Sequence, residues 1–209
     1  MNPEMIQRYS NIQRYGFSID NIRIWKIKRF IYKYLKPSSI ILDIGCGDGI
    51  LTQGLVNKHK VIGLDYSESI LRNAINKGIL PKIGNLEKGI SLMDNFCDII
   101  VAGEVIEHLQ DTDLFLREIR RILKPDGVCI LSTPNLASLP RRLKLLFGIN
   151  PSMEASPTFG NPAGHLRYFT YSLLYRLLKF HKLKVIEFQS NLIPKRFGST
   201  LICVIKKEI

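Results

Sequence analysis

Apolar residues along the chain switch between two spacings, and the switching predicts strands and helices in turn. Short apolar runs predict buried strands, which occupy residues 39–44, 60–64, 97–102, 128–132, 184–189 and 200–205. Between these runs the apolar positions repeat at helical spacing, which predicts helices over residues 22–36, 50–57, 68–76, 112–123 and 171–180. Strands that alternate with helices indicate an α/β fold, in which a mostly parallel sheet is sandwiched between helices.

The two ends of the pattern differ from its middle. The first predicted helix is rich in Lys and Arg, and Pro37 ends it, so residues 1–37 are expected to form an N-terminal helical segment. The last two strands follow each other without a helix, so they should pair antiparallel as a hairpin at one edge of the sheet. A chain of 209 residues suits a single domain over residues 1–209.

Residues 134–166 interrupt the alternation. The stretch contains five prolines and a basic cluster, and it begins where a central strand is expected to end. Long irregular segments inside compact domains are often functional loops, and open α/β sheets bind ligands at the carboxyl ends of their strands. We therefore expect an inserted lid over the substrate, called here the lid segment.

The composition adds a charge bias and excludes two classes of protein. Thirty Lys and Arg against eighteen Asp and Glu give a net charge of +12, which favours anionic partners such as nucleic acid, acidic substrates or anionic lipid. No apolar run is long enough for a transmembrane segment, and the first residues do not resemble a signal peptide, so a cytoplasmic location is expected. The four cysteines stand singly, which argues against disulfides and a structural zinc site.

The segment IILDIGCGDGIL (residues 40–51) places Gly45, Gly47 and Gly49 where a strand turns toward a helix. Without side chains the backbone can turn sharply, and a ligand can lie directly on it. The next strand ends in Asp65, about twenty residues later, where a carboxylate can accept both hydroxyls of a ribose. Ile50 stands where a dinucleotide-binding loop would have glycine, which disfavours an NAD-dependent oxidoreductase.

Several motifs in order carry a resemblance to a known family. They are ILDIGCGDG, GLDYSESIL, DIIVAGEVIEHL, FLREIRRILKPDG, ILSTPN and GHLRYFT, and they span the chain from Ile40 toward its end. The chain resembles class I S-adenosylmethionine-dependent methyltransferases, and among them the branch that contains ubiquinone-biosynthesis O-methyltransferases. The resemblance implies a Rossmann-like, doubly wound, mostly parallel seven-stranded sheet with an antiparallel C-terminal hairpin strand, and S-adenosyl-L-methionine as cofactor.

The resemblance also assigns a cofactor-binding set. Asp65 would hold the ribose, with Tyr66 beside the adenine, and Arg23 would bind the cofactor carboxylate. Asn85 stands where the family commonly has an acidic residue near the adenine amine, so its contact should be weaker. The remaining implied positions, several of them along the methionine part, are Asp43, Gly45, Cys46, Gly47, Gly49, Leu86 and Gly103.

Glu104, Glu107 and His108 follow the fourth predicted strand directly. If the chain is helical there, residues three and four apart share a face, and two carboxylates with an imidazole form a candidate divalent-metal site. His165, at the end of the lid segment, is a fourth candidate ligand. The pattern resembles the metal-binding motif of ubiquinone-biosynthesis O-methyltransferases, with Mg²⁺, Mn²⁺ or Zn²⁺ as the ion. Two alternatives stay open: His108 acting as a metal-free acid or base, with Glu104 as a second catalytic group, and a purely structural role.

The sequence therefore predicts an S-adenosylmethionine-dependent methyltransferase that acts on oxygen. The acceptor would be a small hydroxylated metabolite, a quinol precursor or a glycan. The alternatives are a metal-dependent RNA 2′-O-methyltransferase and a non-catalytic S-adenosylmethionine-binding partner subunit. Basic residues suit an anionic acceptor: Arg141, Arg142 and Lys144 in the lid segment, and Arg167 just after it. Apolar residues of the segment suit a lipid-linked acceptor with peripheral membrane contact: Leu143, Leu145, Leu146 and Phe147.

Overall fold

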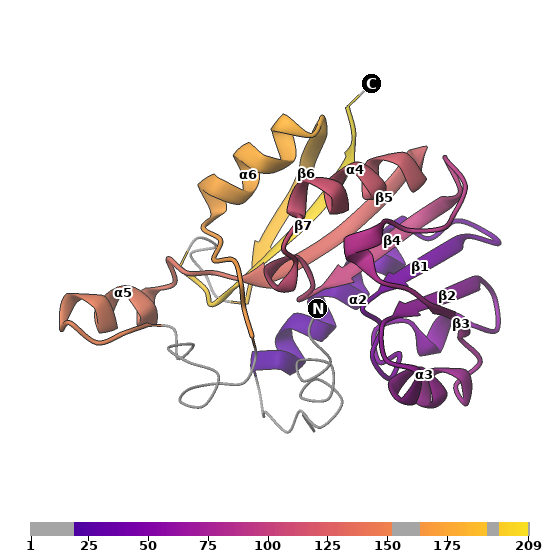
Figure 1. The fold of residues 1–209 in the computed structure, drawn as a ribbon, viewed down its shortest axis with the longest axis horizontal. Coiled ribbons are helices and arrows are strands. Elements are labelled where there is room, and N and C mark those ends of the chain that lie inside the picture. Colours follow the sequence, from indigo (N-terminus) through magenta and orange to yellow (C-terminus); the bar gives the residue numbers. More distant parts are fainter. Residues whose placement is uncertain (1–18, 152–163, 192–196, 209) are drawn as a thin grey trace.

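A computed structural model describes residues 19–151, 164–191 and 197–208, which contain one seven-stranded sheet flanked by helices (Figure 1). The strands are β1 (Ile40–Ile44), β2 (Lys60–Asp65), β3 (Leu80–Ile83), β4 (Cys97–Gly103), β5 (Leu123–Pro134), β6 (Leu183–Ser190) and β7 (Thr200–Lys207). The helices are α2 (Ile19–Tyr34), α3 (Glu68–Ile75), α4 (Thr112–Ile122), α5 (Leu139–Leu146) and α6 (Tyr171–Phe180). Single 3-10 turns are η1 (Gln53–Leu55), η2 (Leu86–Lys88) and η3 (Ile106–His108).

The strand order β3-β2-β1-β4-β5-β7-β6 confirms the predicted fold class. Strands β1 to β5 pair in parallel, whereas β7 runs antiparallel to both β5 and β6. The expected C-terminal hairpin is therefore present, with β7 inserted between β5 and the edge strand β6. The order reverses direction between β1 and β4, which is where open α/β sheets hold ligands.

Side chains of alternate strand residues build one apolar core on each face of the sheet. On one face α4 and α6 contribute Phe115, Ile119 and Leu174, all at most 1% exposed. On the other face Ile27 of α2 and Leu71 of α3 pack against the sheet. Because both faces are covered, the central strands are mainly apolar, as their sequences predict.

Three local predictions need correction or completion. The helix expected over residues 50–57 is wrong, because the chain there forms turns and the single 3-10 turn η1. Strand β3 was not predicted, since its sequence LPKI is largely exposed and contains a proline. Residues 1–18 of the expected N-terminal segment, and residues 152–163 of the lid segment, lie outside the described residues.

The two ends of the lid segment are joined at their base. Asn135 and Phe169 form an isolated parallel bridge, in which the Leu136 amide donates to the Phe169 carbonyl at 2.8 Å. Between these ends, α5 projects from the body of the molecule (Figure 1). In the described part of the chain, no helix has the length and apolar character that crossing a membrane requires.

Candidate functional site

The glycine turn begins at the carboxyl end of β1, and each of its glycines has a positive φ. A side chain at Gly45 or Gly49 would collide with the core, because an added Cβ would lie 2.7 Å from Val105 Cγ2 or 2.3 Å from Ile79 Cδ1. At Gly47, with φ +56°, an added Cβ would meet nothing within 4 Å. The turn is therefore packed from below at two glycines and open above the third, where a ligand could approach the backbone.

Asp65, at the end of β2, holds this turn in place. Its Oδ2 accepts a hydrogen bond from the Gly47 amide at 3.0 Å, and its Oδ1 accepts one from the Ser67 amide at 3.1 Å. Tyr66 beside it is 41% exposed, and its contact with an adenine stays a prediction. The Cys46 side chain is buried in the core instead, and burial raises the pKa of its thiol, so only its backbone can line the turn.

Asp43 lies beneath the turn and is buried. Its Oδ2 accepts a hydrogen bond from the Thr52 hydroxyl at 2.7 Å, whereas its Oδ1 is buried without a hydrogen-bond partner among the described residues. Burial, with the carboxylates of Asp65 and Asp48 nearby, raises the pKa of Asp43 to about 7, although the bond from Thr52 opposes the shift. Thr52 was not predicted as part of the site; the sequence signal was a hydroxyl directly after the two apolar residues that follow the glycine turn.

The two residues expected near the adenine lie at η2. Asn85 caps this turn, because its Oδ1 accepts a hydrogen bond from the Glu87 amide at 3.0 Å. Leu86 is half-buried and packs on the core. The side-chain carbonyl oxygen of Asn85, which would accept a hydrogen bond from an adenine amine, therefore already accepts one from the Glu87 amide.

Arg23 and Glu104 meet beside Gly103, at the end of β4. Arg23 Nη1 lies 3.9 Å from Glu104 Oε1, and both side chains are largely buried. The same Nη1 lies 3.8 Å from the point where a Cβ on Gly103 would stand. Arg23 is thus a buried cation at the methionine end of the expected cofactor site rather than a solvated helix residue.

Glu104 departs from the predicted helical geometry. Its φ is +57°, and Ser132 of β5 fixes it twice: the Ser132 hydroxyl donates to Oε1 at 2.8 Å, and the Glu104 amide donates to the Ser132 carbonyl at 3.0 Å. The chain then forms η3 instead of an α-helical turn. The prediction that Glu104 shares a helix face with Glu107 and His108 is therefore wrong in its geometry.

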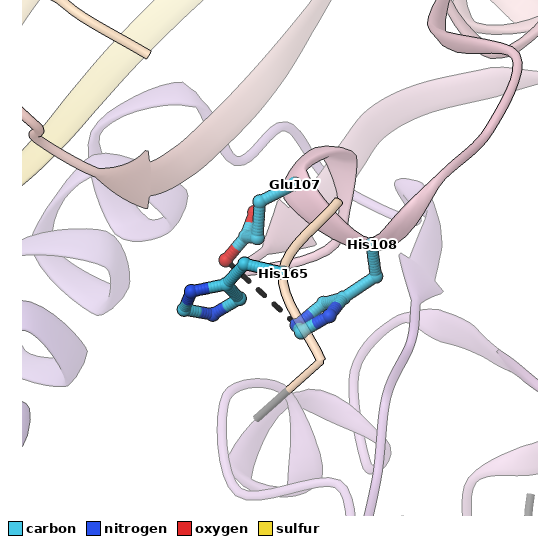
Figure 2. A group of neighbouring side chains, drawn as sticks. All are labelled: Glu107, His108 and His165. Carbon is cyan, nitrogen blue, oxygen red and sulfur yellow. Dashed lines mark ion pairs between the residues drawn. The ribbon is translucent and has the colours of Figure 1, made fainter. Parts of the chain in front are cut away.

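Glu107, His108 and His165 come together at the carboxyl edge of the sheet (Figure 2). Their candidate ligand atoms lie within 4.8 Å of one another, and Glu107 Oε1 is 4.0 Å from His108 Nε2. The two imidazole rings lie 4.8 Å apart, centroid to centroid. The structure thus groups three of the four predicted metal ligands, and Glu104 lies outside this trio.

Glu107 is the buried centre of the trio. Its Oε2 accepts a hydrogen bond from the Thr133 hydroxyl at 3.0 Å, while its Oε1 is buried with no hydrogen-bond partner among the described residues. Burial, and then the nearby Glu104, raise the pKa of Glu107 well above its usual value. A carboxylate oxygen left in this state is suited to receive either a cation or a proton.

The end of the lid segment is attached to the same residue. The Glu107 carbonyl accepts hydrogen bonds from the Leu166 amide at 2.8 Å and the Arg167 amide at 3.0 Å. On the imidazole side, His108 Nδ1 lies 3.4 Å from the Gly164 carbonyl. These contacts bring His165 to the trio although it is far from Glu107 in sequence.

The basic residues expected to bind an anionic acceptor are mostly engaged with the backbone. Arg141 donates to the Asn135 carbonyl, Arg142 to the Ala137 carbonyl and Arg167 to the Gln110 carbonyl, at 2.7 to 2.8 Å. Lys144 is exposed. The arginines therefore fix the ends of the lid segment, and their contacts with an acceptor stay a prediction.

Residues 42–131 match the family described as "Methyltransferase domain". Two named relatives extend this similarity: a demethylmenaquinone methyltransferase of Lactobacillus johnsonii, 36% identical over 67% of this chain and 61% of its own, and the human mitochondrial ubiquinone biosynthesis O-methyltransferase, 32% identical over 51% of this chain and 32% of its own. The chain spans half or less of the first curated relatives that it matches.

Among solved structures, the PH0226 protein of Pyrococcus horikoshii has the same fold, with a TM-score of 0.72 and 19% identity over 96% of this chain and 98% of the other. This likeness concerns the fold. Residues 42–131 therefore contain a methyltransferase domain, and the sheet and glycine turn around it agree with the class I S-adenosylmethionine-dependent fold that the sequence predicts.

The glycine turn generates a paired prediction. Alanine at Gly47 or Gly49 meets the same backbone cost, about 1 kcal/mol, but only the Gly49 variant collides with the core. Gly47→Ala should therefore weaken binding of S-adenosylmethionine, measured by calorimetry, while its free energy of unfolding falls by about 1 kcal/mol. Gly49→Ala should lose more stability. Unchanged affinity for S-adenosylmethionine in Gly47→Ala would show that the open face of the turn does not receive the ligand.

The raised pKa of Asp43 predicts a pH-dependent stability. The folded protein keeps this proton up to about pH 7, whereas the unfolded chain releases it near pH 4, so the free energy of unfolding should fall as the pH rises between these values. The loss is at most about 4 kcal/mol. Asp43→Asn should reduce that slope in urea titrations at several pH values, although the raised pKa of Glu107 still contributes to it, while Asp126→Asn, which removes an exposed charge, should keep it. An unchanged slope in Asp43→Asn would contradict the assignment.

Proposed function

We propose that the chain transfers the methyl group of S-adenosylmethionine to a hydroxyl oxygen, with His108 next to the reacting atom. The observation that carries the proposal is the closeness of the open glycine turn to the trio of Glu107, His108 and His165. Val105 joins the two, because its side chain packs against Gly45 and its carbonyl accepts the His108 amide at 3.0 Å.

The methyl donor would be bound by charged side chains that are already in place at this site. Asp65 would accept the ribose hydroxyls, since a carboxylate oxygen that holds one amide can accept further hydrogen bonds. The buried Arg23 guanidinium would bind the carboxylate of the methionine part. Glu104, 3.9 Å from Arg23 and fixed by Ser132, would position that guanidinium. We therefore assign Glu104 to donor binding, whereas the sequence had suggested a catalytic or metal-binding role.

On the acceptor side, His108 would take the proton. If Nδ1 donates to the Gly164 carbonyl, Nε2 carries the lone pair. The acceptor oxygen would attack the methyl carbon as the carbon–sulfur bond breaks, its proton would pass to Nε2, and the sulfonium would leave as a neutral thioether. Glu107, 4.0 Å from Nε2, would stabilise the resulting imidazolium.

The trio also fits a divalent cation. Two imidazoles and a carboxylate favour Zn²⁺ over Mg²⁺, and Oε1 of Glu107, which has no hydrogen-bond partner among the described residues, is available as a ligand atom. When bound, such an ion would act as a Lewis acid and lower the pKa of a coordinated hydroxyl. His108 and His165 would hold it together with Glu107.

The acceptor class is the finer part of the proposal. Two relatives are named for ubiquinone and menaquinone chemistry, and one of them is named an O-methyltransferase. They support a hydroxylated ring, with or without a lipid tail, as the acceptor. A glycan and an RNA end with free hydroxyls are the other acceptors to be compared with it.

A pair of variants tests the donor and acceptor sides separately. With methyl-labelled S-adenosylmethionine, we expect label on a catechol or prenylated catechol rather than on an oligosaccharide or RNA oligonucleotide. His108→Gln should lower turnover about a hundredfold or more with little change in donor affinity, and Asp65→Ala should lower donor affinity about tenfold. Donor binding without labelling of any acceptor, even in cell extracts, would instead favour a non-catalytic binding subunit.

Metal titration tests the trio independently of the reaction. Calorimetry with Zn²⁺ or Mn²⁺ should detect one site, and His165→Gln should weaken it about tenfold or more. His181→Gln is the matched control, since His181 pairs with Asp113 at 2.7 Å outside the trio. If neither ion binds and turnover survives a chelator, His108 acts as a metal-free base and the cation is removed from the proposal.

A further inference from the structure

Helix α5 presents an apolar face that is about half exposed or more in the described part of the chain. Leu143 comes four residues after Leu139, and Leu146 and the C-cap residue Phe147 come three and four residues after Leu143, so these side chains share a face. Their exposed fractions are 48%, 48%, 75% and 75%. No residue of α5 is buried, so the helix contributes nothing to the core beneath it.

Hydrogen bonds at the base of α5 fix where the helix begins. The Asn135 side chain donates to the Gly198 carbonyl at 2.8 Å, and the Asn135 amide donates to the Ser199 carbonyl at 2.7 Å. The Leu139 amide donates to the Phe197 carbonyl at 2.9 Å. The helix therefore starts from a fixed point on the sheet and projects away from the body (Figure 1).

Positive charge surrounds the apolar face. Residues 139–151 include three basic residues and no acidic one. On a helical wheel Arg142 and Lys144 flank the apolar face on opposite sides, and both are exposed. The whole chain carries +12, so a second copy placed face to face on α5 would meet like charge.

We propose that α5 docks on the surface of an anionic lipid bilayer. An exposed apolar face between basic side chains is the arrangement by which interfacial helices insert into the headgroup region. Anionic lipid attracts basic residues near the surface. The helix follows β5 at the edge of the sheet where the trio lies, so docking would hold that edge next to the lipid. The inference concerns binding alone and does not rest on methyl transfer.

Vesicle flotation of the full chain tests the inference. The protein should float with vesicles that contain phosphatidylglycerol and should stay behind with phosphatidylcholine alone. Leu146→Glu combined with Phe147→Glu should lower the bound fraction about tenfold or more, and Lys144→Glu about fivefold. Phe180→Glu is the matched control, because Phe180 on α6 is 79% exposed. This variant should bind the vesicles as the unmodified protein does.

Each other outcome overturns the proposal. Equal binding by the double variant would place the contact elsewhere on the chain. Absence of binding to phosphatidylglycerol vesicles would exclude lipid, and sedimentation of a dimer that the double variant dissociates would identify a second copy as the occupant. Circular dichroism of the double variant should match that of the unmodified protein, since both positions are 75% exposed; a lost spectrum would refute the view that α5 stands apart from the core. If the double variant loses its spectrum, the vesicle binding of Lys144→Glu alone tests the role of charge.

Discussion

The hydrogen bond from the Gly47 amide to the Asp65 carboxylate joins the ends of two parallel strands, and the geometry of the site depends on it. The register of β1 with β2 brings Ile44 opposite Leu64, so the turn after one strand and the acid at the end of the other meet at one edge. The Leu64 carbonyl also accepts the Gly45 amide at 2.7 Å. The open face of the turn is thus fixed by the sheet before any ligand arrives.

A second constraint is the burial of charge around that edge. Asp43, Glu104, Glu107 and Arg23 all lie largely or wholly inside the protein, where an ion needs a partner. Hydroxyls from Thr52, Ser132 and Thr133 supply some of the hydrogen bonds. One oxygen of Asp43 and one of Glu107 remain without a hydrogen-bond partner within the described ranges, although the Glu107 oxygen lies 4.0 Å from His108 Nε2.

The sequence predicted those parts of the molecule whose cause is local. Alternating apolar runs indicated the central strands, and the glycine spacing with Asp65 indicated the turn, because each depends on neighbours in the chain. The prediction from sequence failed where tertiary contacts determine the local conformation. Glu104 takes a positive φ because Ser132, on another strand, bonds its amide and its carboxylate, and a helical wheel cannot contain that information. The exposed edge strand β3 carries too weak an apolar signal to be seen.

The lid segment is fastened at both ends: Asn135 bridges Phe169, and the Glu107 carbonyl holds Leu166 and Arg167. A loop with its two ends fixed can accept insertions, deletions and substitutions without displacing the residues at its base. His165 and His108 would keep their places while the sequence between Gly148 and Gly164 diverged. If this segment covers the acceptor, as the sequence predicts, descendants of this chain could change acceptor by altering one stretch of sequence while the histidines at its base stay in place.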